Sequence, residues 1–251
     1  KTNLMISGAR HLRLRKVMRP VSLTLFMIAA MASQGTAQQI TGADYTDPTT
    51  RYAHGILGDA IEHGSLELSM SDGTRTSFKL PASEVFEDTL PRLIDVTGDG
   101  APEVIVVQSH KNRGAKLAVY DHTGLIAETP NIGRSNRWLA PLGGADLDGD
   151  GLIELAYIDR PHLAKTLRIW RFENAELKHI ADLKGYTNHR IGERDIAGGI
   201  RECNDRPEMI VASADWSKLV AVIFEGTQFK TKTLGRDTSR AAFAKAMGCK
   251  L

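Results

Sequence analysis

The sequence predicts an all-β fold, a small β-propeller of about four four-stranded blades followed by a short C-terminal helix. Three observations predict it: apolar segments recur about every 51 residues, a tight turn follows each of them, and two repeats share an Asp-rich loop. Short strands at a constant period are typical of propellers, in which each blade must pack against its neighbours to bury a core. A β-sandwich is the alternative, but it would not explain the constant period.

The first 37 residues have the pattern of a secretory signal peptide. Six basic residues and no acidic one lie within residues 1–19, an apolar run follows over 21–32, and Gly35-Thr36-Ala37 offers small residues at a cleavage site. The apolar run is shorter than the ~20 residues of a membrane-spanning helix, and an uncleaved N-terminal anchor is the alternative. We therefore expect export to the periplasm or the medium, with a single domain over 38–251 that has no membrane span.

Charge argues against nucleic-acid binding. The whole chain carries 32 basic and 30 acidic residues, a net charge of +2. Six of the basic residues belong to the expected signal, which leaves 26 basic against 30 acidic residues and a net charge of −4. The basic balance of the whole chain therefore comes from the signal and gives no basic surface for a nucleic acid.

Four repeats are expected, at about 44–94, 95–145, 146–196 and 197–236. Their central strands begin at Leu66, Leu117, Leu167 and Leu219, and turns follow at 72–73, 123–124, 173–174 and 225–226, where Gly or Asn tolerates positive φ. In three repeats a strand that is apolar on both faces precedes, at 103–107, 154–158 and 208–211. A shorter strand is expected before each of these, at 93–95, 142–146 and 191–197.

The C-terminal stretch 238–247 predicts a helix, because alanines fill it, Asp237 or Thr238 could cap it, and Gly248 follows it. The chain has two cysteines, Cys203 and Cys249. In an exported protein such a pair favours a disulfide, which would tie the helix to the last repeat; two buried free thiols are the alternative.

A nine-residue Asp-rich loop occurs twice, as DVTGDGAPE over 95–103 and DLDGDGLIE over 146–154. Oxygen side chains at positions 1, 3 and 5, a bend at the Gly of position 6, a carbonyl at position 7 and an acid at position 9 supply the hard ligands that Ca²⁺ prefers. The predicted ligands of the two Ca²⁺ sites are Asp95, Thr97, Asp99, Ala101 and Glu103, and Asp146, Asp148, Asp150, Leu152 and Glu154.

The two loops have two interpretations other than this Ca²⁺ site. An EF-hand is excluded, because position 12 holds Val106 or Tyr157 instead of Glu and strands flank the loops. A metal-free loop built from Asx turns is the other alternative. Since Thr97 replaces an Asp, we expect weaker Ca²⁺ binding in the first loop.

The loop within a recurring strand unit resembles the FG-GAP/VCBS repeat family, the Ca²⁺-binding propeller repeats of integrin α-chain heads, over about residues 44–234. The resemblance implies that each loop joins the first two strands of a blade and binds Ca²⁺. Propellers of the family often have seven blades, whereas this chain has room for about four. The other two repeats keep only remnants of the loop, at Asp44, Thr46 and Pro48 and at Glu202 and Asn204, and no metal is expected there.

The opposite ends of the blades are expected to form a ligand-binding face. In a propeller these ends carry the turns between strands 2 and 3 and the connections between blades. Guanidinium groups and indole faces in such loops suit anionic or sugar-like ligands, although a solvated polar face is the alternative. The residues concerned are His110, Arg113, Arg137, Trp138, His162, His189, Arg190 and Trp216.

Together these patterns predict an exported Ca²⁺-binding module that interacts with a protein, a glycan or an anionic small molecule. No Gly-x-Ser-x-Gly, His-Glu-x-x-His or phosphate-loop motif occurs, so no catalytic residue is predicted. The alternative is a periplasmic propeller enzyme, a hydrolase or lyase, in which His110, His162 and His189 converge.

Overall fold

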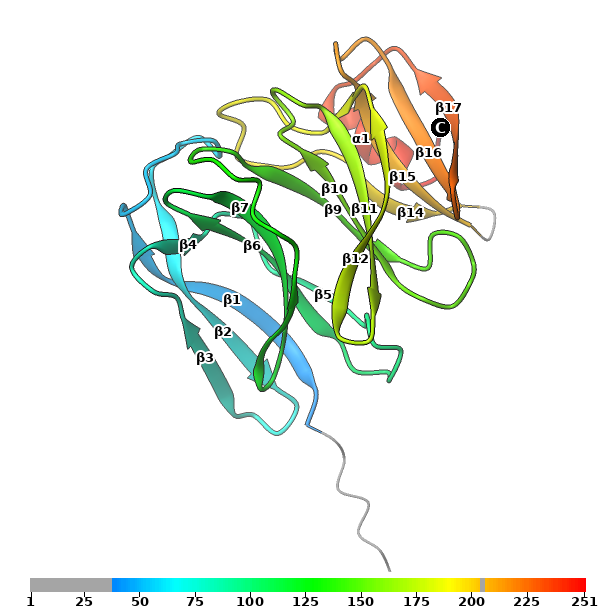
Figure 1. The fold of residues 1–251 in the computed structure, drawn as a ribbon. Helices are drawn as coiled ribbons and strands as arrows, with labels where there is room; N and C mark the ends of the chain where they lie inside the picture. The colour runs from blue at the N-terminus through cyan, green and yellow to red at the C-terminus, as the bar shows by residue number, and fades with distance from the viewer. Residues whose placement is uncertain (1–37, 204–205) are drawn as a thin grey trace, which may run out of the picture. The chain divides into compact units, whose positions relative to one another are not determined.

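The computed structural model describes residues 38–203 and 206–251, and every structural statement below concerns those residues (Figure 1). The expected signal peptide over 1–37 lies outside the described residues. Within the described part, none of the helices has the length and apolar character needed to cross a membrane.

The described chain is all-β with one short helix, as the sequence predicts. Its elements are β1 (Ile40–Thr49), β2 (Glu62–Met70), β3 (Arg75–Lys79), β4 (Glu84–Phe86), β5 (Arg92–Ile94), β6 (Glu103–His110), β7 (Gly114–Asp121), β8 (Gly124–Glu128), β9 (Leu139–Ala145), β10 (Glu154–Asp159), β11 (Thr166–Glu173), β12 (Glu176–Lys184), β13 (Tyr186–Thr187), β14 (Gly199–Glu202), β15 (Pro207–Ser213), β16 (Leu219–Glu225), β17 (Gln228–Gly235) and α1 (Arg240–Met247).

Consecutive antiparallel strands form four groups, which in Figure 1 run from blue to red. They are β1-β2-β3, β5-β6-β7-β8, β9-β10-β11-β12 and β14-β15-β16-β17, and β13 also pairs with β15. The short strand β4 pairs with both β2 and β6 and so joins the first two groups into one sheet. Within the described residues the groups therefore make three antiparallel sheets, and none of these sheets closes on itself.

Three of the four groups have the four strands expected of a repeat and the first has three, and two positions differ from the prediction. The first strand of the last group is β14 at Gly199–Glu202, not the predicted stretch 191–197, because its residues pair with β15 in register, Ile200 opposite Met209. In the first group, Asp44, Thr46 and Pro48 lie inside the ten-residue strand β1, so the structure has no loop at the position where the repeat suggested a remnant.

Each pair of neighbouring groups shares a hydrophobic core. Leu66 and Val106 belong to the core between the first and second groups, and Val107 and Tyr157 to the core between the second and third. Ile158 and Met209, with Val222, belong to the core between the third and fourth groups. Since both faces of β6 and β10 are covered in this way, these strands are apolar on both sides.

The helix α1 packs on the last sheet through Ala242, Phe243 and Ala246. It begins after Ser239, whose hydroxyl accepts the N–H of Ala242, so the cap is Ser239 rather than Asp237 or Thr238. The predicted Cys203–Cys249 disulfide is present, with 5.9 Å between the two Cα atoms. It ties the end of the helix to the segment between β14 and β15, which is the constraint expected for the last repeat.

Candidate functional site

The two Asp-rich loops each join adjacent antiparallel strands, β5 to β6 and β9 to β10. Both loops are held by the same internal hydrogen bonds, in which N–H groups at positions 4 and 6 donate to the first Asp. The glycines at position 6 have φ of 87° and 88°, a conformation that side chains disfavour. The bonds run from Gly98 and Gly100 to Asp95 at 2.7 and 2.9 Å, and from Gly149 and Gly151 to Asp146 at 2.7 and 3.0 Å.

The Glu at position 9 begins a strand and lies beneath each loop. Glu103 accepts the N–H of Val96 at 2.8 Å, and Glu154 accepts the N–H of Leu147 at 2.9 Å. Burial raises the pKa of both carboxyls, and those N–H bonds act in the opposite direction. Each Glu therefore holds the start of its loop in place, and one of its carboxylate oxygens faces the interior of the loop.

The donor set of the second loop fits a hard divalent cation. Asp146, Asp148 and Glu154 each have one carboxylate oxygen within 4.8 Å of those of the other two. Ca²⁺ prefers such a group of oxygen ligands. The Oδ1 atom of Asp148 is buried and has no hydrogen-bond partner in the described structure. These are the residues that the sequence assigned to a Ca²⁺ site, and a fourth, Asp150, lies at the exposed rim.

The first loop has fewer carboxylates around its centre, because Thr97 takes the place of Asp148. The Thr97 hydroxyl lies 3.5 Å from Asp95 and 3.4 Å from Glu103. Asp99 accepts the N–H of Ala101 at 2.8 Å. Thr97 thus lies between Asp95 and Glu103, whereas a cluster of three carboxylates is found, among the described residues, in the second loop.

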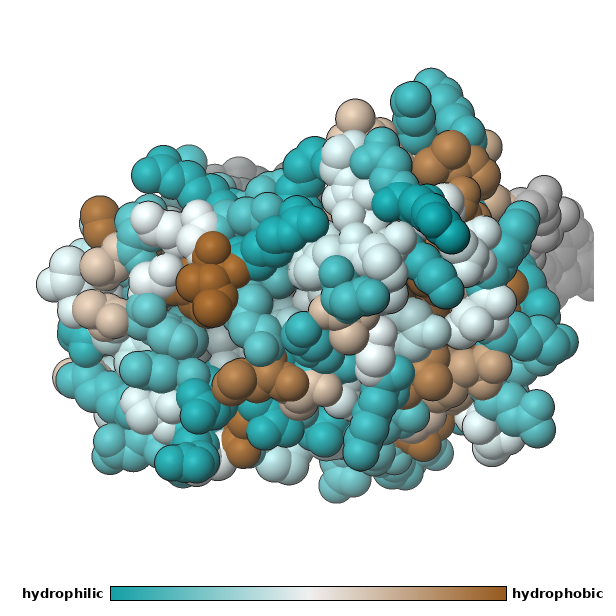
Figure 2. Space-filling model, turned by 90° about the horizontal axis from the view of Figure 1, so that it is seen from above, coloured by the Kyte–Doolittle hydropathy of each residue, from teal (hydrophilic) through white to brown (hydrophobic). Residues whose placement is uncertain are grey.

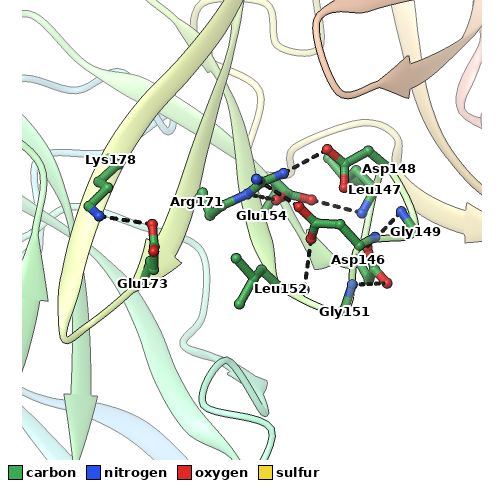
Figure 3. Close-up of polar contacts among 11 residues, drawn as sticks. Asp146, Leu147, Asp148, Gly149, Gly151, Leu152, Glu154, Arg171, Glu173 and Lys178 are labelled. Carbon is green, nitrogen blue, oxygen red and sulfur yellow. Dashed lines mark hydrogen bonds and ion pairs between the residues drawn. The ribbon is translucent and has the colours of Figure 1, made fainter.

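The sequence patterns did not predict one residue that lies beside the second loop. Arg171 on β11 faces the loop and contacts Asp148 at 2.6 Å, Asp150 at 2.8 Å and Glu154 at 2.5 Å (Figure 3). Its strand position lies directly opposite Glu154 in the β10–β11 register. Only strand pairing brings the two together, since 17 residues separate them in the chain.

The segment between β14 and β15 is the counterpart, in the last repeat, of the two Asp-rich loops. Glu208 occupies the position of Glu103 and Glu154, and it forms an ion pair with the buried Arg201 at 2.6 Å. Arg201 also donates to the carbonyl of Ala246 in α1. Of the remnants noted in the sequence, Glu202 is the last residue of β14 and Asn204 lies outside the described residues.

A second candidate site lies at the other end of the strands. The register places Leu139 opposite Asp159, so the segment before β9 and the turn after β10 share this end, while the Asp loop between β9 and β10 lies at the opposite end. A cavity of about 230 Å³ opens there. Its lining residues are His54, Ile56, Asn136, Arg137, Trp138, Arg160, Pro161, His162, Leu163 and Ile191.

The wall of this cavity contains a carboxylate-held imidazole that sequence reasoning missed. His54 Nδ1 lies 2.6 Å from Oε1 of Glu87, which is fully buried and also accepts a hydrogen bond from Ser109. The indole N–H of Trp138 donates to the Glu87 carbonyl at 2.8 Å, so Trp138 is a buried part of the cavity wall. His54 lies before β2, away from the repeated motifs, and no sequence pattern singles it out.

The predicted ligand-face residues divide into two sets. Arg137, Trp138 and His162 line the cavity, and a shallower hollow beside it is lined by His162, His189, Arg190 and Trp216. His110 and Arg113 lie at the β6–β7 turn, where His110 accepts the N–H of Asn112 and Arg113 lies 3.5 Å from Glu84. The expected convergence of three histidines is therefore wrong for His110.

His162 and His189 do meet, with Nε2 of His162 3.1 Å from Nδ1 of His189. Burial lowers the pKa of His162 to about 4, helped by the neighbouring His189, and burial also lowers the pKa of His189. Both rings are neutral near pH 7, so the positive charge at this end comes from arginines and Lys165. Arg190 stacks over Trp216, with its guanidinium carbon 3.8 Å from the ring centroid.

The molecular surface beyond these sites is mostly polar. Figure 2 shows hydrophilic residues over most of the upper side of Figure 1, with hydrophobic residues in separate patches. At the rim of the cavity, Leu163 and Ile191 are 62% and 72% exposed. The cavity thus combines arginines, imidazoles and apolar side chains.

Part of the chain matches a known protein family. Residues 95–190 match the family model described as FG-GAP-like repeat. The matched range begins at the first Asp loop, includes the second, and ends beside the cavity residue Ile191. No curated protein matches the chain.

Proposed function

We propose that this chain, whose residues 95–190 match the FG-GAP-like repeat family, is an exported Ca²⁺-binding module of the β-propeller type. In this proposal the four strand groups are four blades. The shared cores between consecutive groups support it, as does the contact of β9 with both β5 and β14, the first strands of the neighbouring groups. The disulfide and the signal-like N-terminal sequence support an oxidising, extracytoplasmic location.

The observation that carries the Ca²⁺ part is the pair of loops in which the first Asp accepts the N–H groups of positions 4 and 6 and the Glu of position 9 accepts the N–H of position 2. Asp146, Asp148 and Glu154, with Asp150 at the rim, would hold the ion in the second loop, and Asp95, Thr97, Asp99 and Glu103 in the first. Bound Ca²⁺ would supply positive charge to carboxylates that the fold holds close together, and would stabilise the native state by mass action.

Saturating Ca²⁺ is expected to raise the melting temperature relative to chelator, because a ligand at 100 times its Kd adds about 2.7 kcal/mol to the free energy of unfolding. The double variant Asp99→Asn/Asp150→Asn removes the position-5 carboxylate from both loops and should lose most of this rise. Asp237→Asn makes the same chemical change before α1, where the Asp237 carboxylate accepts the N–H of Ser239 as Asp99 accepts that of Ala101, and it should behave as the wild type. Equal melting temperatures of the wild type with Ca²⁺ and with chelator would sink the Ca²⁺ proposal.

The ligand of the module is proposed to be a small organic anion bound in the cavity. The lining residues include two arginines, Arg137 and Arg160, and no carboxylate. Arg160 pairs with Asp159 and His54 with Glu87, whereas Arg137 hydrogen-bonds only the Asn136 carbonyl in the described structure. Arg137 therefore offers its charge to a ligand whose apolar part would lie against Trp138 and Ile56.

Calorimetric titration with benzoate, and with uncharged benzamide as the matched probe, tests this assignment. Benzoate is expected to bind more tightly than benzamide, and Arg137→Gln should weaken benzoate binding about tenfold, the effect of losing one charge-assisted hydrogen bond. Arg134→Gln, an exposed arginine of the same loop, is the control. Equal affinity for the two probes, or no saturable binding of benzoate, contradicts the proposal.

An enzyme acting in the same cavity is the second candidate function. One observation favours it: the buried Glu87 holds His54 at the cavity wall, and a carboxylate-oriented imidazole is a common general base. Hydrolysis of an aryl ester by the wild type and by Arg134→Gln, but not by His54→Ala, would establish it. Equal rates in all three proteins would exclude it.

A further inference from the structure

In the second Asp loop, one guanidinium contacts three of the four carboxylates that were predicted to bind Ca²⁺. Arg171 approaches Glu154 through Nε at 2.5 Å, Asp150 through Nη1 at 2.8 Å and Asp148 through Nη2 at 2.6 Å. The Arg171 side chain is only 16% exposed. Figure 3 shows it reaching from β11 to Asp148 and Glu154, well apart from the Lys178–Glu173 pair at the end of the same hairpin.

The first loop has no arginine in this place, although its backbone is built in the same way. In the β6–β7 register Val104 lies opposite Tyr120, so the residue that corresponds to Arg171 is Asp121. The Asp121 carboxylate accepts the N–H groups of Thr123 and Gly124 in its own turn. The bonds to the first Asp and to the Glu of position 9 recur in both loops, and the two sites differ in the residue at position 3 and in this residue of the facing strand.

The last sheet contains a similar glutamate–arginine pair. There the buried Glu208 is paired with Arg201, again an arginine supplied by a neighbouring strand of the sheet. Of the three equivalent glutamates, Glu154 and Glu208 contact an arginine, while Glu103 is held by the N–H groups of Val96 and Thr97. Two of the three equivalent glutamates are therefore paired with an arginine of a neighbouring strand.

We propose that Arg171 is the internal counter-cation of loop 146–154 and competes with Ca²⁺ for Asp148, Asp150 and Glu154. Ca²⁺ would then bind more tightly in loop 95–103, which reverses the order expected from Thr97. The reason is electrostatic: Ca²⁺ must displace the guanidinium from three carboxylates or bind beside a like charge, and both options cost free energy. The proposal rests on the Ca²⁺ function proposed above.

The second loop is isolated by removing a carboxylate from the first. Asp99→Asn is compared with Asp99→Asn/Arg171→Gln by calorimetric Ca²⁺ titration, and loss of Arg171 is expected to tighten Ca²⁺ binding at least about tenfold. Arg168→Gln in the Asp99→Asn background is the matched control. Arg168 lies on the same strand and faces Asp159 and Asp182, away from the loop, so its loss should leave the affinity unchanged.

Thermal unfolding gives a second readout that needs no bound metal. In chelator, Arg171→Gln is expected to melt below the wild type, because three carboxylates then lose their counter-charge, and Ca²⁺ should restore most of the loss. Arg171→Lys keeps one positive charge and is expected to stay folded in chelator even if Arg171→Gln does not.

The outcomes separate this proposal from the proposed function. If the wild type binds Ca²⁺ but the loss of Arg171 changes neither the affinity of the second loop nor the melting temperature in chelator, the Arg171 proposal alone is overturned. If the wild type binds no Ca²⁺ and Arg171→Gln binds one ion, the Arg171 proposal stands and the proposed Ca²⁺ function of the native chain fails. If no variant binds Ca²⁺, both fail.

Discussion

His54→Ala is expected to lower the free energy of unfolding by about 3 kcal/mol, since it leaves a buried carboxylate without its imidazole partner. Glu87 is fully buried, and in the described structure its side chain contacts only His54 Nδ1, at 2.6 Å, and the Ser109 hydroxyl. Removal of the imidazole leaves Ser109 as the one remaining donor, so the charge of Glu87 would be poorly compensated. Urea unfolding at neutral pH measures the loss.

A surface histidine pair provides the control for this prediction. His179 Nε2 lies 2.8 Å from Asp182, with the two side chains 44% and 33% exposed. Because water can replace the imidazole there, His179→Ala should cost less than about 1 kcal/mol. If the two alanine variants lost the same stability, Glu87 would not depend on His54, and the carboxylate-held imidazole could not be invoked for ligand binding or for catalysis.

Glu62→Gln is expected to stabilise the protein in mildly alkaline solution, by up to about 3 kcal/mol near pH 8. Glu62 is buried in β2, and its pKa is raised from 4.5 to about 9 by burial first and then by the nearby charges of Glu87, Asp59 and Asp88. Burial and these neighbouring carboxylates therefore favour the neutral form of Glu62.

The sign of the pH dependence follows from that raised pKa. The folded state binds the Glu62 proton more tightly than the unfolded state, so this group favours folding fully below the unfolded pKa of 4.5. The benefit is lost as pH rises toward the folded pKa of about 9. A glutamine does not titrate, so the variant should lack this decline and gain on the wild type as pH increases through the window.

Urea unfolding midpoints at about pH 5 and about pH 8 check this prediction. The gain of Glu62→Gln over the wild type should grow between the two pH values. Glu67→Gln is the control, because Glu67 lies on the same strand but pairs with Arg75 at the surface. A stability difference between Glu62→Gln and the wild type that stays constant with pH would show that Glu62 does not titrate in this window.

Several parts of the fold were predictable from local sequence. The alternating segments that begin at Leu66, Leu117, Leu167 and Leu219 lie in strands, and glycine or asparagine turns close their hairpins, because both signals depend on short-range geometry. The Asp loops were predictable for the same reason: their glycines and carboxylates form hydrogen bonds within nine residues. The first strand of the last repeat was misplaced, because β14 has little apolar pattern of its own and is defined by pairing with β15.

The sequence by itself determined the all-β class, the repeated strand unit, the two Asp loops and the two cysteines that pair. Each of these depends on residues close together in the chain or, for the cysteines, on their number. Only the tertiary structure placed Arg171 on the second loop and Glu87 behind His54, because strand register and packing between sheets bring together residues that are distant in sequence. Charges in such positions decide which cation a loop accepts and which ligand a cavity attracts, and no local pattern encodes them.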